Sequence, residues 1–204
     1  RRGIVHFRLK GEPVVAPSTE AAGNGALMRC LPVALATYGA EAACIEAGWR
    51  AQAHVTHNNA LSDAAGILFM HLIHAALAGA DKRHLLNRIA HPFARSHPEF
   101  TFRPKRCEYP SGYVVHTVIA VLQSFFDTDT FEECLVEVVN RGGDADTTGA
   151  IAGMLAGAHY GMNALPARWL RQLDPAIRQR CSGEGEKLLP ESVRQAAASV
   201  VMLP

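Results

Sequence analysis

The sequence has little of what marks several large classes of protein. Its five cysteines are odd in number, widely spaced and without a Cys-x-x-Cys pair, so they predict neither a disulfide framework nor a zinc knuckle. Lysine and arginine are scattered and the formal net charge is only +1, which disfavours nucleic acid or an anionic membrane as a partner. No charged-then-apolar leader and no membrane-spanning stretch is evident. We therefore expect a protein of the reducing cytoplasm.

What is present suits a single globular core. The chain has 204 residues, of which 49% are hydrophobic and 19% charged, and this is enough for one domain over residues 1–204. The hydrophobic periodicity is helical almost throughout, and alternating strands with tight-turn pairs are lacking. The sequence therefore predicts an all-α, single-domain fold. Helices are expected at Ala26–Tyr38, Ala40–His54, Leu61–Leu77, Asp81–Arg95, Tyr113–Phe126, Phe131–Arg141, Thr147–Tyr160 and Ser192–Met202.

The clearest helix boundaries surround Phe131–Arg141. Thr130 and Glu133 have the spacing of a capping box, and Gly142 supplies a left-handed stop. The next helix carries a glycine at every fourth position, and each costs about 1 kcal/mol relative to alanine. Such a stripe predicts close packing of a central helix against a neighbour. Its members are Gly149, Gly153, Gly157 and Gly161. By contrast, the segment His97–Pro110 is expected to be an irregular loop, with a short strand as an open alternative.

Oxygen-bearing side chains gather between those two helices. The run Gly142–Thr148 (GGDADTT) places two carboxylates and a hydroxyl at neighbouring turn positions. An all-oxygen set without histidine or cysteine suits a hard ion such as Mg²⁺ or Mn²⁺. From the residues alone, a second role is as well supported as metal binding: Asp144 or Asp146 caps the following helix and interacts with its positive end.

A second candidate is the glycine-rich turn Gly23–Arg29 (GNGALMR), which leads into a helix. Free backbone N–H groups at such a turn can receive a phosphate. The turn lacks the third glycine of a dinucleotide fingerprint and the Gly-Lys-Ser/Thr of a nucleotide-hydrolase loop. An ordinary helix-entry turn is therefore an equal alternative to a diphosphate site.

The third candidate is the polar cluster Thr56–Asp63 (THNNALSD), at the start of an apolar helix. Capping by Asn59 or Ser62 explains part of it. His57 either donates a hydrogen bond to a ligand or is structural. Further along, the ring of Tyr113 either stacks on a base or packs in the core. Two more histidines, His71 and His74, share a helical face but have no third zinc ligand nearby in sequence.

Taken in this order, the three segments resemble the ADP-ribosylglycohydrolase family. GNGALMR at 23–29, THNN at 56–59 and GGDADTTGA at 142–150 match successive family motifs, and GMLAGAHYG at 153–161 continues the match. The likeness spans most of the chain. It is greatest to those members that remove ADP-ribose from an arginine of dinitrogenase reductase, the nitrogenase iron protein. The resemblance thus implies a hydrolase that cleaves the N-glycosidic bond between ADP-ribose and a protein arginine.

The resemblance also implies a helical bundle with two Mg²⁺ or Mn²⁺ ions at the mouth of a cleft. Asp144, Asp146 and Thr147 match the family's C-terminal metal ligands, and the two aspartates are the implied catalytic carboxylates. His57 falls where the family orients the substrate, and Tyr113 where it stacks on adenine. The positions that contact ADP-ribose or the modified side chain are Glu20, Gly23, Asn24, Gly25 and Met28.

One part of the family pattern has no counterpart here. The family's N-terminal region carries a Thr-Asp-Asp segment with further metal ligands, which these 204 residues lack. We therefore expect residues 1–204 to be the C-terminal and larger part of an N-terminally truncated enzyme. Two other functions remain open: hydrolysis of a different ADP-ribose linkage, such as that to serine or an ester, and binding of ADP-ribose without activity.

Overall fold

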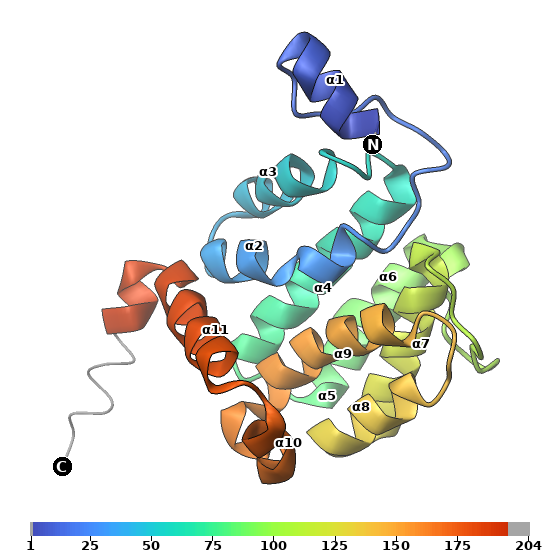
Figure 1. Ribbon diagram of the computed structural model, residues 1–204. Helices are drawn as coiled ribbons and strands as arrows, with labels where there is room; N and C mark the ends of the chain where they lie inside the picture. The colour runs from blue at the N-terminus through green and yellow to red at the C-terminus, as the bar shows by residue number, and fades with distance from the viewer. Residues whose placement is uncertain (1, 196–204) are drawn as a thin grey trace.

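The computed structural model describes the chain from residue 2 to residue 195, and that part contains helices and no strand (Figure 1). The all-α prediction is confirmed. A single isolated bridge, between Gly23 and Tyr113, is the nearest approach to sheet pairing within these residues. The helices are α1 (Arg2–Lys10), η1 (Leu27–Arg29), α2 (Leu31–Ala36), α3 (Ala42–Ala53), α4 (Ala60–Leu77), α5 (Lys82–His84), η2 (Leu85–Ala90), α6 (His91–Ser96), η3 (Pro98–Phe100), α7 (Val114–Asp127), α8 (Phe131–Val139), α9 (Ala145–Tyr160), η4 (Met162–Ala164), α10 (Ala167–Gln172) and α11 (Pro175–Leu188).

Helix α4 lies at the centre of the bundle and packs against α3, α7 and α9 (Figure 1). Asn59 begins it, because its side-chain oxygen accepts hydrogen bonds from the backbone N–H groups of Leu61 (2.8 Å) and Ser62 (3.4 Å). The hydroxyl of Ser62 is buried and takes no part in capping. By length and composition α4 is apolar enough to cross a membrane, with a mean hydropathy of 1.5. Its central position in the bundle explains that composition.

Trp49 of α3 fixes how α3 and α4 meet. Its fully buried ring lies directly on Gly66, where a β-carbon would overlap the ring atoms. The indole N–H donates to the Asp63 carboxylate at 3.0 Å, and the same carboxylate lies 3.0 Å from His54 Nε2. The glycine in α4 is therefore required by the close approach of the α3 indole.

The junction of α8 and α9 matches the sequence prediction closely. Thr130 and Glu133 form the expected capping box, and Gly142 has φ of +74°. The prediction for the glycine stripe of α9 holds at one end only. A β-carbon on Gly149 would lie 3.0 Å from Val139 of α8, whereas nothing lies within 4 Å of one on Gly157. Gly161 ends the helix with φ of +75° instead of packing against a neighbour.

Two expected helices contain a proline, and the first of them is interrupted. The segment Ala26–Tyr38 consists of η1 and α2, because Pro32 has no N–H and suits only a helix start. Asp81–Arg95 is helical as expected, but residues 85–90 are a π-helix just before Pro92. The segment His97–Pro110 is a loop with the short helix η3 and no strand in it.

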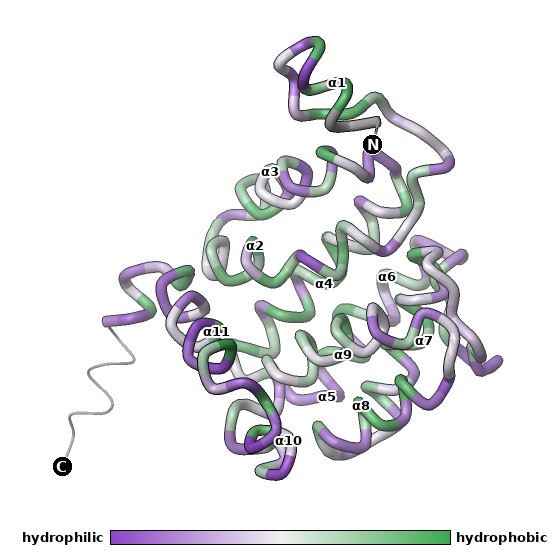
Figure 2. Tube along the Cα trace, in the orientation of Figure 1, coloured by the Kyte–Doolittle hydropathy of each residue, from purple (hydrophilic) through white to green (hydrophobic). Residues whose placement is uncertain are grey.

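Three α-helices, α1, α10 and α11, were not predicted, and none of their described side chains is buried. No described side chain of α10 or α11 is buried, and α11 is largely hydrophilic (Figure 2). The N-terminal α1 likewise exposes its described side chains. Most of the expected helix Ser192–Met202 lies outside the described residues, although residues 191–195 are helical.

Candidate functional site

The turn between α8 and α9 is built to place Asp144. Gly142 and Gly143 have φ of +74° and +64°, a conformation that favours glycine. A β-carbon on Gly143 would overlap the carbonyl oxygen of Pro110, so the two backbones touch. The N–H of Asp144 donates to that carbonyl at 2.7 Å. The loop that ends at Pro110 therefore fixes where α9 begins.

The Asp144 carboxylate does not cap its own helix. It makes no capping hydrogen bond; instead Oδ2 accepts from the amide of Asn24 at 2.6 Å. The same Asn24 nitrogen donates to Thr117 Oγ1 of α7 at 2.9 Å, and the Asn24 side chain is buried. The capping alternative is thus not borne out for Asp144. One carboxylate oxygen is held by the glycine-rich turn, and Oδ1 makes no hydrogen bond within the described chain.

The glycine-rich turn also lies against the start of α7. The Asn24 N–H donates to the Gly112 carbonyl at 2.9 Å, and the Val114 N–H donates to the Ala22 carbonyl at 2.9 Å. These two bonds form the bridge between Gly23 and Tyr113. Tyr113 precedes α7, its side chain is 39% exposed, and its ring meets His116 edge-on. An accessible aromatic ring therefore stands beside the turn.

His57 also lies against this turn. A β-carbon on Gly23 would lie 3.0 Å from His57 Nε2, and one on Gly25 would lie 3.0 Å from Cε1. The glycines therefore leave room for the imidazole. Burial, followed by the charge of Arg29, lowers the pKa of His57. The ring is thus predominantly neutral near pH 7.

Glu20 and Met28 lie at the edge of this arrangement. Glu20 is exposed, in a loop that is tied to the polar cluster because the Asn59 amide donates to the Ser18 carbonyl at 2.8 Å. Met28 is 49% exposed in η1, and its N–H donates to the Asn24 carbonyl at 3.0 Å. Both side chains are accessible from solvent, as contact with a ligand requires.

A buried arginine holds the loop that supports the site. Arg141 pairs with Glu137 at 2.7 Å and donates to Gln123 Oε1 at 2.6 Å and to the Cys107 carbonyl at 3.1 Å. Its own carbonyl accepts from the Tyr109 N–H at 3.2 Å. Burial raises the pKa of Glu137. The hydrogen bonds from Arg141 and Ser124 and the nearby arginine charges together outweigh burial, so the pKa lies below its ordinary value.

Comparison with known proteins shows the family of the chain. The family model described as ADP-ribosylglycohydrolase matches residues 2–198. The chain belongs to the ADP-ribosylglycohydrolase family. It is 44% identical to the ADP-ribosyl-[dinitrogen reductase] glycohydrolase of Rhodospirillum rubrum over 93% of this chain and 63% of that protein. It is 32% identical to the ADP-ribosylarginine hydrolase Tri1 of Pseudomonas putida over 77% of this chain and 43% of that protein.

A solved structure gives the same result for the fold. A chain of an ADP-ribosylglycohydrolase-related protein complex superposes with a TM-score of 0.78 and 34% identity, covering 92% of this chain and 66% of that one. These 204 residues therefore span 63% and 43% of the two relatives and 66% of the solved chain.

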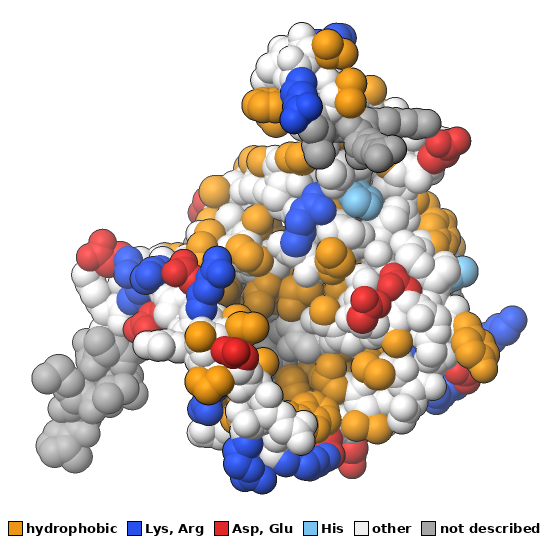
Figure 3. Space-filling view, in the orientation of Figure 1, with side chains coloured by type: hydrophobic (Ala, Val, Ile, Leu, Met, Phe, Trp, Pro, Cys, Tyr) orange, Lys and Arg blue, Asp and Glu red, His pale blue; other side chains and the backbone are white. Residues whose placement is uncertain are grey.

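The predicted metal ligands of this family member lie together at the start of α9, where Figure 3 shows acidic side chains on the surface. Asp146 is exposed, and Asp144 and Thr147 are partly buried. Two carboxylates and a hydroxyl fit a hard divalent cation, because all three donors are oxygen. The described residues contain no group of three or more histidine, cysteine, aspartate or glutamate side chains able to hold a metal. The donor set therefore fits part of a coordination shell, and the metal site stays a prediction.

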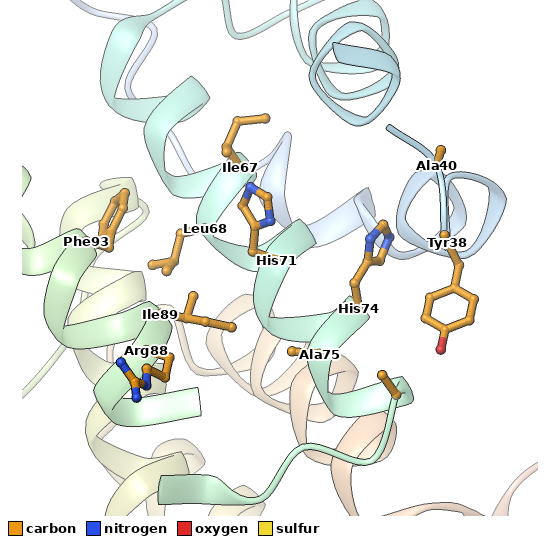
Figure 4. Close-up of a pocket in the computed structure, with 12 residues that line it drawn as sticks. Tyr38, Ala40, Ile67, Leu68, His71, His74, Ala75, Arg88, Ile89 and Phe93 are labelled. Atoms are coloured by element: carbon orange, nitrogen blue, oxygen red, sulfur yellow. The ribbon is translucent and has the colours of Figure 1, made fainter. Parts of the chain in front are cut away.

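A separate cavity lies away from these residues. It has a volume of about 730 Å³ and opens beside α4, with His71, His74, Ile67 and Arg88 in its lining (Figure 4). None of the predicted site residues lines it. His74 Nε2 is 2.7 Å from the Ala34 carbonyl, which gives this histidine a structural partner in place of zinc.

Sequence reasoning missed the residues that support the predicted ones. Thr117 lies one helical turn after Tyr113 and accepts from Asn24. Arg29 ends the motif GNGALMR and Thr56 begins the motif THNN, and the Arg29 guanidinium donates to the Thr56 hydroxyl at 2.7 Å. A polar residue in a helix as apolar as α7 is a usable signal for Thr117. Nothing in the local sequence shows that the other two meet.

Proposed function

We propose that this family member hydrolyses the N-glycosidic bond between ADP-ribose and an arginine side chain, with dinitrogenase reductase as the protein substrate. The observation that carries the proposal is the 2.6 Å hydrogen bond from Asn24 to Asp144. It joins the glycine-rich turn to the acidic turn, and both Tyr113 and His57 lie next to the glycine-rich turn. The Pseudomonas putida relative is an ADP-ribosylarginine hydrolase, which supports arginine as the linked residue. The Rhodospirillum rubrum relative is an ADP-ribosyl-[dinitrogen reductase] glycohydrolase, which supports the protein substrate.

In this proposal Asp144, Asp146 and Thr147 hold one of two Mg²⁺ or Mn²⁺ ions. These three side chains fill only part of the coordination shells of two such ions. When bound, such ions raise the acidity of a water molecule and orient it. The chain's own contribution is to hold the carboxylate: the Asn24 amide fixes Oδ2 of Asp144 and leaves Oδ1 available.

The other groups bind and orient ADP-ribose. The diphosphate-linked ribose binds at the glycine-rich turn, next to the His57 imidazole that packs on Gly23 and Gly25, and the Tyr113 ring stacks on adenine. His57 orients the substrate from its position over the turn, with Glu20 and Met28 at the rim. Hydrolysis of a glycosidic bond passes through an oxocarbenium-like state, and the negative charges of Asp144 and Asp146 stabilise it.

Replacing Asp146 with alanine tests the proposal. Asp146 is exposed on the first turn of α9, so Asp146→Ala leaves the fold intact. We expect loss of Mn²⁺ binding in calorimetry and loss of ADP-ribose release from ADP-ribosylarginine. Asp129→Ala, at an exposed position between α7 and α8, is the matched control and keeps both. Normal metal binding and normal release by Asp146→Ala would refute the assignment.

A second candidate function is binding of ADP-ribose without hydrolysis. It is favoured by the lack of a three-acid cluster in the described residues. Calorimetry with ADP-ribose, with and without Mn²⁺, distinguishes the two, because a silent binder gives heat and no product. Parallel assays on ADP-ribosyl serine and an ADP-ribose ester test whether the linkage differs from arginine.

A further inference from the structure

Arg29 is held in one orientation by four hydrogen bonds. Its Nε donates to Gln52 Oε1 at 3.0 Å, Nη1 to the Gly25 carbonyl at 2.9 Å, and Nη2 to the Gln52 carbonyl at 3.1 Å and to Thr56 Oγ1 at 2.7 Å. The Gln52 amide in turn donates to the Ala26 carbonyl at 3.2 Å. These bonds join the glycine-rich turn and η1 to the C-terminal end of α3. The guanidinium therefore belongs to the site, although it is partly exposed.

The hydroxyl of Thr56 connects Arg29 to His57. A guanidinium only donates, so Thr56 Oγ1 is the acceptor of the bond from Arg29. The same oxygen lies 2.6 Å from Nδ1 of His57. The positive charge of Arg29 polarises the hydroxyl and favours donation of its proton to Nδ1. Because the bond made by one ring nitrogen sets the protonation of the other, the imidazole proton is then on Nε2.

Nε2 lies against the glycine-rich turn. A β-carbon on Gly23 would lie 3.0 Å from Nε2 and one on Gly25 would lie 3.2 Å from it, so the imidazole occupies the room that the two glycines leave. Among the residues that the structure describes, no hydrogen-bond partner is found for it. Burial and the Arg29 charge lower the pKa of His57, which favours the neutral ring, in which only one of the two nitrogens carries a proton.

We propose that Arg29 and Thr56 are positioning residues that keep the proton of neutral His57 on Nε2. This N–H then donates to an acceptor oxygen of ADP-ribose beside the glycine-rich turn. The identity of the ligand rests on the proposed function, whereas the tautomer does not.

Nitrogen-15 NMR of the histidine rings in the whole 204-residue chain tests the tautomer directly. His74 serves as an internal reference, because its Nε2 lies 2.7 Å from the Ala34 carbonyl and must carry the proton. We expect His57, assigned with the His57→Gln variant, to give the same pattern as His74 at neutral pH. A proton on Nδ1 of His57 would overturn the proposal.

Variants of Thr56 test whether its hydroxyl sets the His57 tautomer, apart from any effect on folding. Thr56→Ser keeps the hydroxyl and keeps the His57 pattern. Thr56→Val removes the donor to Nδ1, so the two ring-nitrogen signals of His57 move toward each other as tautomers mix. Unchanged His74 signals show that the valine variant is folded. A Thr56→Val spectrum identical to that of the unsubstituted chain would show that the Thr56 hydroxyl does not set the tautomer of His57.

Titration with ADP-ribose tests the ligand. We expect Thr56→Val to bind ADP-ribose about fivefold more weakly than Thr56→Ser, roughly the effect of one ordinary hydrogen bond. Equal affinities in the two variants would overturn the proposed donation by His57. Failure of the unsubstituted chain to bind ADP-ribose would count against the proposed function, and the NMR result would still decide the tautomer.

Discussion

Adding one methyl group to Gly143 is expected to weaken the fold and displace Asp144. The residue has φ of +64°, and a β-carbon there would overlap the carbonyl oxygen of Pro110 and lie 2.7 Å from the carbonyl carbon of Tyr109. Both neighbours are backbone atoms, so no side-chain rotation relieves the overlap. The substitution Gly143→Ala therefore forces the turn itself to move.

The size of the effect follows from two contributions. An L-residue in the left-handed conformation costs about 1–2 kcal/mol. Separation of the Asp144 N–H from the Pro110 carbonyl, now 2.7 Å apart, removes a hydrogen bond worth about 1 kcal/mol. The free energy of unfolding is thus expected to fall by about 2–3 kcal/mol, a shift of about 1 M in the urea midpoint.

Gly157→Ala is the matched control for urea unfolding. Gly157 lies in α9, and nothing is within 4 Å of its added β-carbon. Alanine is the better helix former by about 1 kcal/mol, so this variant is expected to gain stability. Mn²⁺ binding should weaken in Gly143→Ala and remain in Gly157→Ala. A Gly143→Ala chain with the urea midpoint of the unsubstituted protein would refute the reasoning.

Two other variants test the packing and the charge network. Gly66→Ala places a β-carbon inside the Trp49 ring, so overpacking is expected to lower the unfolding free energy by about 1–3 kcal/mol and to change the tryptophan fluorescence; unchanged values for both would contradict the close fit. The lowered pKa of Glu137 contributes stability above the ordinary carboxyl pKa, and this is lost as the pH falls through the folded-state pKa. The acid-induced loss of stability, followed by urea unfolding from pH 6 down to about pH 3, should therefore be smaller in Glu137→Gln than in the unsubstituted chain; equal slopes would exclude this role.

The sequence predicted best those elements that carry both a periodic apolar face and a local boundary signal. Helix α8 has its capping box and its glycine stop, and α4 has Asn59 at its start. Helix α11 also has clear start signals, since Asp174 accepts from the Ala176 N–H at 2.8 Å and Pro175 follows it. It was missed because it buries no side chain and so shows no apolar stripe.

The glycine stripe of α9 shows why spacing alone overstates packing. A four-residue repeat puts glycines on one face of a helix, but the neighbour must run along that whole face for each glycine to be needed. Here α8 ends at Val139, which meets Gly149 at the start of α9. Further along, Gly153 is in ordinary contact with Leu135, and Gly157 faces open space.

The candidate site was predictable as a set of residue types, whereas the pairing of those residues depends on tertiary structure. Asn24 was expected to contact substrate because of its place in the glycine-rich motif, yet its amide is occupied by Asp144 and Thr117. Those partners are 120 and 93 residues away in sequence. They meet because the loop ending at Pro110 holds the start of α9, while the bridge at Tyr113 holds the start of α7. A buried amide with two such acceptors orients a carboxylate, and this explains why an asparagine in the first motif matters to an aspartate in the third.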